Sequence, residues 1–445
     1  MNFIIFACGE LKMETIKPEQ TMEEIIKELR LVVANYNPTK NEKEDLPVKE
    51  LDGTDNPDDV SYITQRTDKY FSKSRRIVER FGEKEVKYGI FMRREVIAAL
   101  NPAVEFIKKY CPEAKIEKMY PEGTLVPGKS KLLQITGPLS KLTELETLIL
   151  QKIGFSCVCA YNAYRMSLYL PNVSFIDMHA RHATGDDMVV AAAYGASVGS
   201  KSAKLQGSKG FIGSSVDLTA RFYDTPFGIG TMPHLVIGYA GSTLRATQMY
   251  IESNPEDTSI TTLVDYFGKE VSDSLEVARW FFDEATENTK GKTLGLRLDT
   301  HGGRFMEGLD YQKSVDEIAN WLRIPGADEY EVVRHIVGND VADSAGDAYL
   351  DQVRKMLFAQ GVSVASLIHI RRILSKSGYP QVKLVASSGF DLQKCKIFAQ
   401  ANAPVDIIGT GSFLPKTISE TYSTCDAYEW NGVKSVKVGR EFLFE

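Results

Sequence analysis

Cysteine is scarce in this chain of 445 residues: six cysteines are scattered along it. So few thiols at such spacing exclude a disulfide framework and are typical of a protein that works in a reducing compartment. Cys157 and Cys159 form a lone Cys-x-Cys pair with no second Cys or His pair nearby at metal-ligand spacing. Buried thiols are therefore favoured over a zinc site.

Long apolar runs are also missing, since none approaches the ~20 residues that span a bilayer. The short apolar start at residues 3–7 lacks the basic region and cleavage site of a signal peptide. A net charge of −6 provides no positive field for nucleic acid or an anionic membrane. We expect a cytoplasmic protein without nucleic-acid or membrane partners, which binds any anionic substrate through local contacts.

The length favours two domains or a large barrel with an added layer. Residues 1–60 read as an extension with one helix, at 21–35, followed by a polar tract. Residues 61–151 read as a smaller α/β domain with helices at 71–81, 93–110 and 139–152, which residues 415–445 can complete. Residues 152–414 form the second expected domain.

In this second domain, short apolar segments end in small or polar residues and lead into helical segments, at 173–178, 210–212, 227–230, 260–264, 294–298, 382–386 and 405–409. Such alternation predicts a parallel sheet or barrel. The carboxyl ends of barrel strands carry the active site, because their loops vary without disturbing the core. No internal repeat is present, which excludes a solenoid.

Two loops of small residues follow the last two expected strands: Ser387, Ser388 and Gly389, then Gly409, Thr410, Gly411 and Ser412. Glycine permits close backbone approach, and hydroxyl and N–H groups can converge on a phosphate oxygen. Each loop alone is also compatible with an ordinary turn. Together they favour a phosphate site of the kind found after the last two strands of many barrels.

After the segment at 173–178, Arg181 lies between His179 and His182. Two histidines without a third ligand seldom hold a metal, so Arg181, which pairs bidentately with phosphate or carboxylate, is the better candidate. An ion pair with Asp186 or Asp187 is the alternative for Arg181.

Arg297 and Asp299 share one side of a strand end by the two-residue strand period, where a buried salt bridge is the alternative to a site. With a phosphosugar pyrophosphate as substrate, Asp299 suits ribose hydroxyls or Mg²⁺. The hydroxyls of Ser214 and Ser215 can donate to a carboxylate, or simply belong to a polar turn.

His234 ends the pentapeptide Gly230-Thr231-Met232-Pro233-His234. A lone histidine is usually structural. Near phosphate groups, however, an imidazole can act as a general base or be phosphorylated itself.

In this order, from about residue 66 to 414, the motifs resemble those of the type II phosphoribosyltransferases that make pyridine mononucleotides, most closely the nicotinate phosphoribosyltransferases. The Thr after Asp299 and the Pro before His234 are similar to the archaeal-style branch. The resemblance implies an α/β fold, with an irregular TIM-like barrel behind an N-terminal α/β sandwich domain. It also implies a homodimer or higher homo-oligomer.

The resemblance assigns roles to single residues. Tyr70, in Thr67-Asp68-Lys69-Tyr70, would stack on the pyridine ring in the neighbouring subunit. Ser215 falls where nicotinamide-using relatives carry an aspartate, which would repel the carboxylate of nicotinate. The remaining assignments are Arg181, Ser214, Thr231 and Arg297 as substrate contacts, Asp299 beside the ring, His234 as the residue phosphorylated by ATP, and the two small-residue loops as phosphate sites.

The implied reaction joins nicotinate to 5-phosphoribosyl 1-pyrophosphate, forming nicotinate mononucleotide and pyrophosphate with Mg²⁺ and coupled ATP hydrolysis, as the first step of NAD salvage from nicotinate. No Mg²⁺ ligands are assigned. The alternatives are transfer to nicotinamide, transfer to quinolinate with decarboxylation, and a non-catalytic homologue that only binds a phosphosugar.

Overall fold

The computed structural model describes residues 5–7, 10–12, 61–284 and 287–445, and the chain divides into two units at residue 62. In the first unit, β1 (Ile5–Ala7) and β2 (Glu10–Lys12) pair as an antiparallel hairpin. The helix that the sequence predicts at 21–35 lies outside the described residues. Everything below concerns the second unit.

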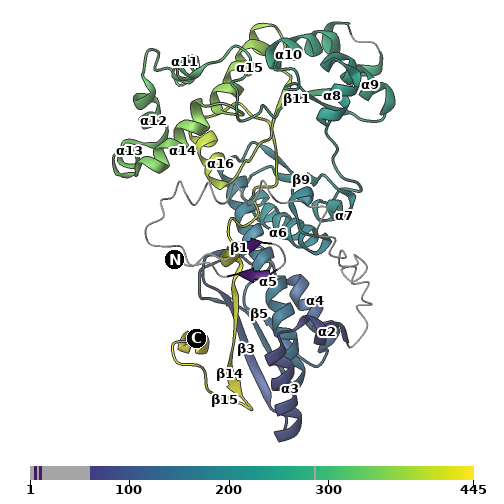
Figure 1. Cartoon of the computed structure of the whole chain (residues 1–445), viewed down its shortest axis with the longest axis vertical. Helices are drawn as coiled ribbons and strands as arrows, with labels where there is room; N and C mark the ends of the chain where they lie inside the picture. Colours follow the sequence, from purple (N-terminus) through teal and green to yellow (C-terminus); the bar gives the residue numbers. More distant parts are fainter. Residues whose placement is uncertain (1–4, 8–9, 13–60, 285–286) are drawn as a thin grey trace. The chain divides into compact units, whose positions relative to one another are not determined.

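An antiparallel sheet of five strands, in the order β15-β14-β3-β7-β5, comes first in this unit (Figure 1). The strands are β3 (Glu85–Met92), β5 (Lys115–Lys118), β7 (Lys131–Pro138), β14 (Ser423–Trp430) and β15 (Val433–Lys434). Tyr88 of β3 lies beside Thr143 on α5 (Leu139–Tyr169), whereas the ring of Phe91 on the same strand meets that of Phe442 with 5.1 Å between centroids. The sheet is thus packed on both faces, and residues from the end of the chain complete it.

The helices of this part are α2 (Ser61–Arg66), α3 (Lys69–Phe81) and α4 (Asn101–Tyr110). The helix predicted at 93–110 begins only at Asn101, because β4 (Val96–Ile97) pairs with β6 (Leu125–Val126). Pro102 then occupies the first turn of α4, where its missing N–H costs nothing. The prediction was wrong for the first eight residues of that range.

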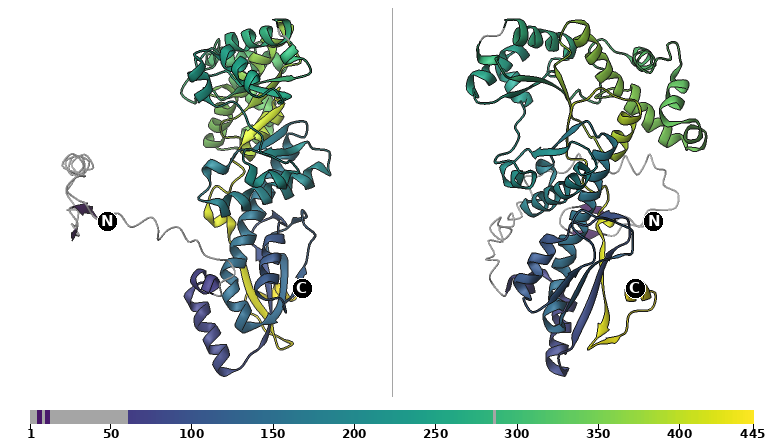
Figure 2. Two further views of the ribbon diagram at one scale, coloured as in Figure 1. Left: turned by 90° about the vertical axis from the view of Figure 1, so that its right-hand side faces the viewer. Right: turned by 180° about the vertical axis from the view of Figure 1, so that it is seen from behind.

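Helix α5 continues 17 residues beyond the predicted end at residue 152, to Tyr169. It contacts β3, β7 and β14 of the antiparallel sheet as well as α6 (Asp186–Lys204) and β9, so one helix serves both sheets (Figure 2). A Cβ at Gly199 of α6 would lie 1.9 Å from the carbonyl oxygen of Ala160 on α5. The two backbones therefore touch at a position that only glycine permits.

The second sheet has six parallel strands in the order β10-β11-β12-β13-β8-β9. They are β8 (Ser174–Asp177), β9 (Gly210–Ser214), β10 (Ser259–Leu263), β11 (Thr293–Leu298), β12 (Lys383–Ala386) and β13 (Ile407–Thr410). Because β13 pairs with β8, strands from the start and the end of this region form one sheet, whose two edge strands are β9 and β10. The predicted irregular α/β barrel is confirmed.

Of the seven predicted strands, the one at 227–230 does not form. Ile229 donates its N–H to the carbonyl of Ser214, yet no ladder follows. Pro226 lacks a donor, and the two glycines at 228 and 230 weaken a strand. This segment lies in the chain between β9 and β10, the two edge strands of the sheet.

The main helices of the barrel region pack around a large apolar core. They are α7 (Asp217–Ala220), α8 (His234–Ala240), α9 (Thr243–Ser253), α10 (Glu270–Arg279), α11 (Tyr311–Trp321), α12 (Glu329–Val337), α13 (Asn339–Ser344), α14 (Asp347–Phe358), α15 (Val364–Lys376) and α16 (Leu392–Gln400). Among the described helices, none has both the length and the apolar composition to cross a membrane. The predicted boundary between domains 61–151 and 152–414 stays a prediction.

Candidate functional site

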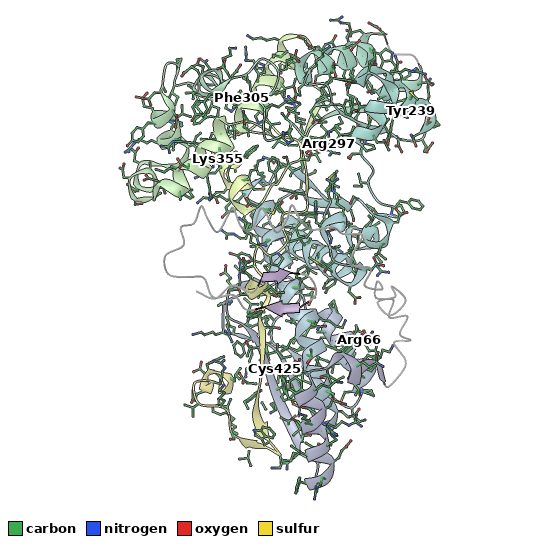
Figure 3. All side chains as sticks on the ribbon, viewed as in Figure 1. Arg66, Tyr239, Arg297, Phe305, Lys355 and Cys425 are labelled. Atoms are coloured by element: carbon green, nitrogen blue, oxygen red, sulfur yellow. The ribbon has the colours of Figure 1, made fainter. Side chains whose placement is uncertain are left out.

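The carboxyl ends of the six parallel strands meet at one edge of the barrel, and the side chains predicted for chemistry follow them. Arg297 of β11, which is labelled in Figure 3, is 8% exposed. Its Nε donates to Ser387 Oγ over 3.0 Å, and its Nη1 donates to Thr231 Oγ1 over 2.8 Å. Its Nη2 donates to Asp299 over 2.9 Å, and Ser387 Oγ donates to the other oxygen of that carboxylate over 2.9 Å.

These bonds join three loops that are far apart in the sequence. The salt bridge left open as an alternative is present between Arg297 and Asp299. The guanidinium of Arg297 has further partners, because it also donates to Thr231 in the loop before His234 and to Ser387 in the first predicted phosphate loop. A buried charge needs several such partners, so the network fixes the orientation of Arg297 at the site.

His234 is the first residue of α8, with its side chain 45% exposed. Its Nε2 lies 3.2 Å from both carboxylate oxygens of Asp265, which directly follows the β10 region. Burial raises the pKa of Asp265, whereas the hydrogen bond from His234 lowers it and the nearby charge of Asp299 raises it further. With Nε2–H donated to Asp265, Nδ1 carries the free lone pair.

The two predicted phosphate loops lie side by side because β12 and β13 pair. Thr410 Oγ1 donates to the carbonyl of Phe390, which comes just after the first loop, over 2.6 Å. The backbone of Ser388 and Gly389 is left-handed, with φ of 84° and 70°. A Cβ at Gly411 would stand 2.9 Å from the Cα of His179, so this loop requires glycine.

His179 does not behave as a metal ligand. Its Nδ1 lies 2.5 Å from the buried carboxylate of Asp177, and its Nε2 lies 3.1 Å from the carbonyl of Val189. Arg181 is exposed and forms no ion pair with Asp186, Asp187 or any other residue of the described ranges. The alternative of an ion pair is thus not seen, and the role of Arg181 as an anion contact stays a prediction.

Ser214 and Ser215 differ in their exposure and in their contacts. Ser214 is buried, and its hydroxyl lies 2.6 Å from that of Thr219. Ser215 is exposed, and its N–H donates to the carbonyl of Asp177 over 2.8 Å. That bond places Ser215 beside the end of β8, whereas Ser214 is used inside the fold.

Tyr70 lies on α3, in the part of the chain that precedes the barrel, and is 60% exposed. Among the described residues, no hydrogen bond or ion pair joins it to the Arg297 network. Its motif is fixed locally, since Thr147 Oγ1 donates to the carboxylate of Asp68 over 3.1 Å and accepts from the Asp68 N–H over 3.2 Å. The Tyr70 ring is exposed, and its contact to a neighbouring subunit stays a prediction.

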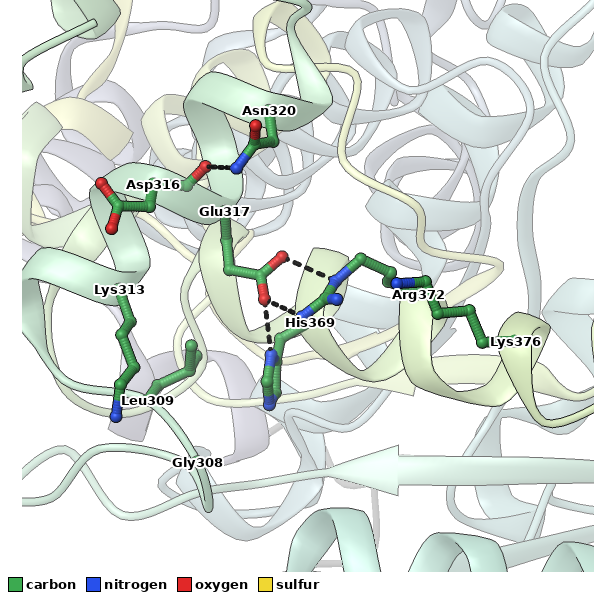
Figure 4. Close-up of a pocket in the computed structure, with 9 residues that line it drawn as sticks. All are labelled: Gly308, Leu309, Lys313, Asp316, Glu317, Asn320, His369, Arg372 and Lys376. Atoms are coloured by element: carbon green, nitrogen blue, oxygen red, sulfur yellow. Dashed lines mark hydrogen bonds and ion pairs between the residues drawn. The ribbon is translucent and has the colours of Figure 1, made fainter. Parts of the chain in front are cut away.

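A separate hollow of about 570 Å³ lies between α11 and α15 (Figure 4). Glu317 lies within hydrogen-bond distance of His369 and accepts from Arg372; burial raises the pKa of its carboxyl, but these hydrogen bonds outweigh burial and lower it overall. None of the predicted site residues lines this hollow. Its charges are largely paired internally, and we assign it no catalytic role.

Two residues of the site were missed by the sequence analysis. Asp265 follows the predicted strand at 260–264, so the rule that polar residues gather after strand ends was sufficient to find it. Lys394 lies on α16, and its Nζ donates to the carbonyl of Ser388 over 2.9 Å. No motif marks it. Within the described ranges, no group of three or more His, Cys, Asp or Glu residues is arranged to hold a metal ion.

Comparison with known proteins gives consistent results. Residues 64–157 match the model of the quinolinate phosphoribosyl transferase N-terminal domain. The structure is similar to nicotinate-nucleotide pyrophosphorylase from Pyrococcus furiosus, with a TM-score of 0.58, 20% identity, and coverage of 86% of this chain and 79% of that one. It is also similar to human nicotinic acid phosphoribosyltransferase, with a TM-score of 0.51, 18% identity, and coverage of 84% and 76%.

The chain has the fold of these enzymes. The sequence matches no curated relative. At identities of 20% and below, the likeness concerns the fold, and the activity has to be argued from the site itself.

Proposed function

We propose that the chain is a nicotinate phosphoribosyltransferase coupled to ATP hydrolysis. The observation that carries the proposal is the Arg297 network, which links the loop of His234 to Asp299 and to the first phosphate loop. One site then combines a phosphate cradle, a cation for a substrate carboxylate and a histidine able to accept a phosphoryl group. The match of residues 64–157 to a phosphoribosyltransferase family model supports the same class.

In the transfer step, the pyridine nitrogen forms a bond to C1 of the ribose while the bond from C1 to the pyrophosphate oxygen breaks. The nitrogen already has a lone pair, so no general base is required. Catalysis rests on positioning and on stabilising the departing pyrophosphate. Arg181 and Ser215 would hold the nicotinate carboxylate, and an aspartate at Ser215 would repel it.

Mg²⁺ fits this site through Asp299, since the ion uses one or two carboxylates together with phosphate oxygens. When bound, it supplies charge stabilisation to the leaving pyrophosphate. The side chain of Asp299 is 20% exposed, and its two oxygens accept from Arg297 and Ser387, so a bound ion would share an oxygen with one of these donors.

In the coupling step, His234 Nδ1 attacks the γ-phosphorus of ATP, the bond to the β-phosphate oxygen breaks, and ADP leaves. Asp265 keeps the proton on Nε2 and stabilises the charge that develops on the ring. Water later cleaves the phosphorus–nitrogen bond and releases phosphate. The exposed Tyr70 would complete the ring site of a second copy, so the proposed enzyme is a homodimer or higher homo-oligomer.

Purified protein with the ribosyl donor and Mg²⁺ tests the proposal, using nicotinate, nicotinamide and quinolinate with and without ATP. We expect nicotinate mononucleotide with ATP stimulation. His234→Ala should abolish ATP hydrolysis while slow transfer without ATP remains. Mononucleotide formed from quinolinate alone, with release of carbon dioxide, would establish the second candidate function, which the N-terminal family match favours.

A further inference from the structure

Lys394 is placed beside the first phosphate loop without a carboxylate partner. Its Nζ donates to the carbonyl of Ser388 over 2.9 Å and lies 4.4 Å from the ring centre of Phe390 and 5.5 Å from that of Phe398. Among the described residues it forms no salt bridge. An ammonium group has three donors, so two of them remain for a ligand.

The carbonyl that Lys394 holds belongs to a strained residue. Ser388 has a φ of 84°, a left-handed backbone conformation that residues with a Cβ rarely adopt. The next residue, Gly389, is left-handed as well, and consecutive N–H groups in such turns form a concave site for anions. The hydrogen bond from Lys394 stabilises the loop in this anion-binding shape.

The surroundings of Lys394 disfavour its charge when no anion is present. Burial lowers the pKa of its ammonium to about 8. Electrostatic interactions with Cys395, Asp391 and Asp299 act in the opposite direction and raise it. Burial raises the pKa of the Cys395 thiol well above its ordinary value, so that group stays neutral. Asp391 is engaged by Lys416, with 2.7 Å between the charged atoms. A phosphate dianion is therefore the counter-charge that this ammonium lacks.

We propose that Lys394 is a binding residue for the 5-phosphate of the ribosyl donor, and that it positions the Ser387–Gly389 loop through the Ser388 carbonyl. The proposal rests on the proposed function for the identity of the substrate. A protonated Lys394 binds the dianion, whereas an unprotonated one does not. Affinity for the phosphate should therefore fall as the pH rises through about 8.

Lys394→Met, Lys394→Arg and the control Lys396→Met on the same helix separate the possibilities. Titration calorimetry uses two probes, 5-phosphoribosyl 1-pyrophosphate and ribose 5-phosphate. At pH 7 we expect Lys394→Met to bind both at least about tenfold more weakly, with Lys394→Arg and Lys396→Met much closer to the parent. Between pH 7 and 9 the affinity of the parent should fall and that of Lys394→Met should stay flat.

Equal affinity of Lys394→Met and the parent at pH 7, or an unchanged pH profile in that variant, would overturn the proposal. A purely structural lysine would not remove the pH dependence. If circular dichroism shows that Lys394→Met does not fold, the same test is made with Lys394→Gln and with the pH profile of the parent. A parent that binds ribose 5-phosphate but forms no mononucleotide would defeat the proposed function and leave the assignment of Lys394 standing.

Discussion

At the scale of single residues, the site depends on partners that orient reactive groups. His234 is half-exposed and gains its orientation from Asp265, whose buried carboxylate faces Nε2. Arg297 gains its orientation from Thr231 and Ser387. Substitution of the partner therefore tests the role of the residue that it holds.

Asp265→Asn should uncouple ATP hydrolysis from the transfer of the phosphoribosyl group. The amide cannot balance the charge on a phosphorylated ring, so we expect ATP hydrolysis to fall about 10²-fold or more, by analogy with other His–Asp pairs, while ATP-independent transfer changes far less. Parallel assays of ADP release and mononucleotide formation measure the two quantities. Asp224→Asn, at an exposed position, serves as the control. Equal losses in both assays would mean that Asp265 supports the whole site and not His234.

Ser215→Asp should change the preference for the pyridine substrate. A carboxylate at this exposed position repels nicotinate and can accept from the amide of nicotinamide, so we expect kcat/KM for nicotinate to fall about 10²-fold and the ratio to shift toward nicotinamide. Ser215→Ala removes the hydroxyl without adding charge and should cost about tenfold or less. Unchanged selectivity in Ser215→Asp would remove Ser215 from the ring site.

At the scale of elements, the packing of α5 against α6 depends on close contact between their two backbones. Gly195 and Gly199 of α6 face the carbonyls of Ser156 and Ala160 on α5, where a Cβ would lie at 2.3 Å and 1.9 Å from the oxygens. These helices also bear on the sheets, since α6 packs against β9 and α5 against β14. A substitution where α5 and α6 cross therefore affects the packing of the barrel.

Gly199→Ala should lower the free energy of unfolding by about 2–3 kcal/mol, because backbone atoms cannot move aside as a flexible side chain can. Denaturant unfolding measures the difference. Gly346→Ala is the control, since a Cβ there meets open space and φ is −72°. The two variants should differ clearly, and equal stability would show that the helices can separate without cost.

At the scale of the whole molecule, residues near the C-terminus complete the antiparallel sheet that precedes the barrel. β14 pairs with β3, more than 300 residues earlier, and Asp426 of β14 lies near the carboxyl of Glu146 on α5. Burial raises the pKa of Glu146 to about 7, and the charges of Asp426 and Asp68 add to the rise. An acid whose folded pKa is raised above its unfolded value weakens the fold once it ionises.

Stability should therefore decline as the pH rises from about 4.5 to 7 through this group, and the loss should be complete above 7. Glu146→Gln removes the charge, so at pH 8 it should be more stable than the parent by up to about 3 kcal/mol. Near pH 4 the advantage should vanish. Thermal unfolding across pH 4–8, with the exposed Glu105→Gln as control, measures this. An advantage that did not depend on pH would mean that packing, not ionisation, is responsible.

The sequence by itself determined most strands of the parallel sheet and supplied the candidate residues of the site. Strand ends followed by small or polar residues predicted six strands of the barrel, the two phosphate loops and the residues Arg297 and Asp299. These features depend on local patterns, because a strand and its loop are close in the sequence. The segment at 227–230 failed where proline and glycine outweighed a short apolar run.

Only the tertiary structure decided which of these pieces meet. Arg297 contacts Thr231 and Ser387 across 66 and 90 residues, and Asp265 reaches His234 across 31. Such partners depend on β13 returning to β8 and on the geometry of strand ends, which no local pattern specifies. The same holds for Lys394, since a lysine on an amphipathic helix looks solvated until the fold brings it against Ser388 and two aromatic rings.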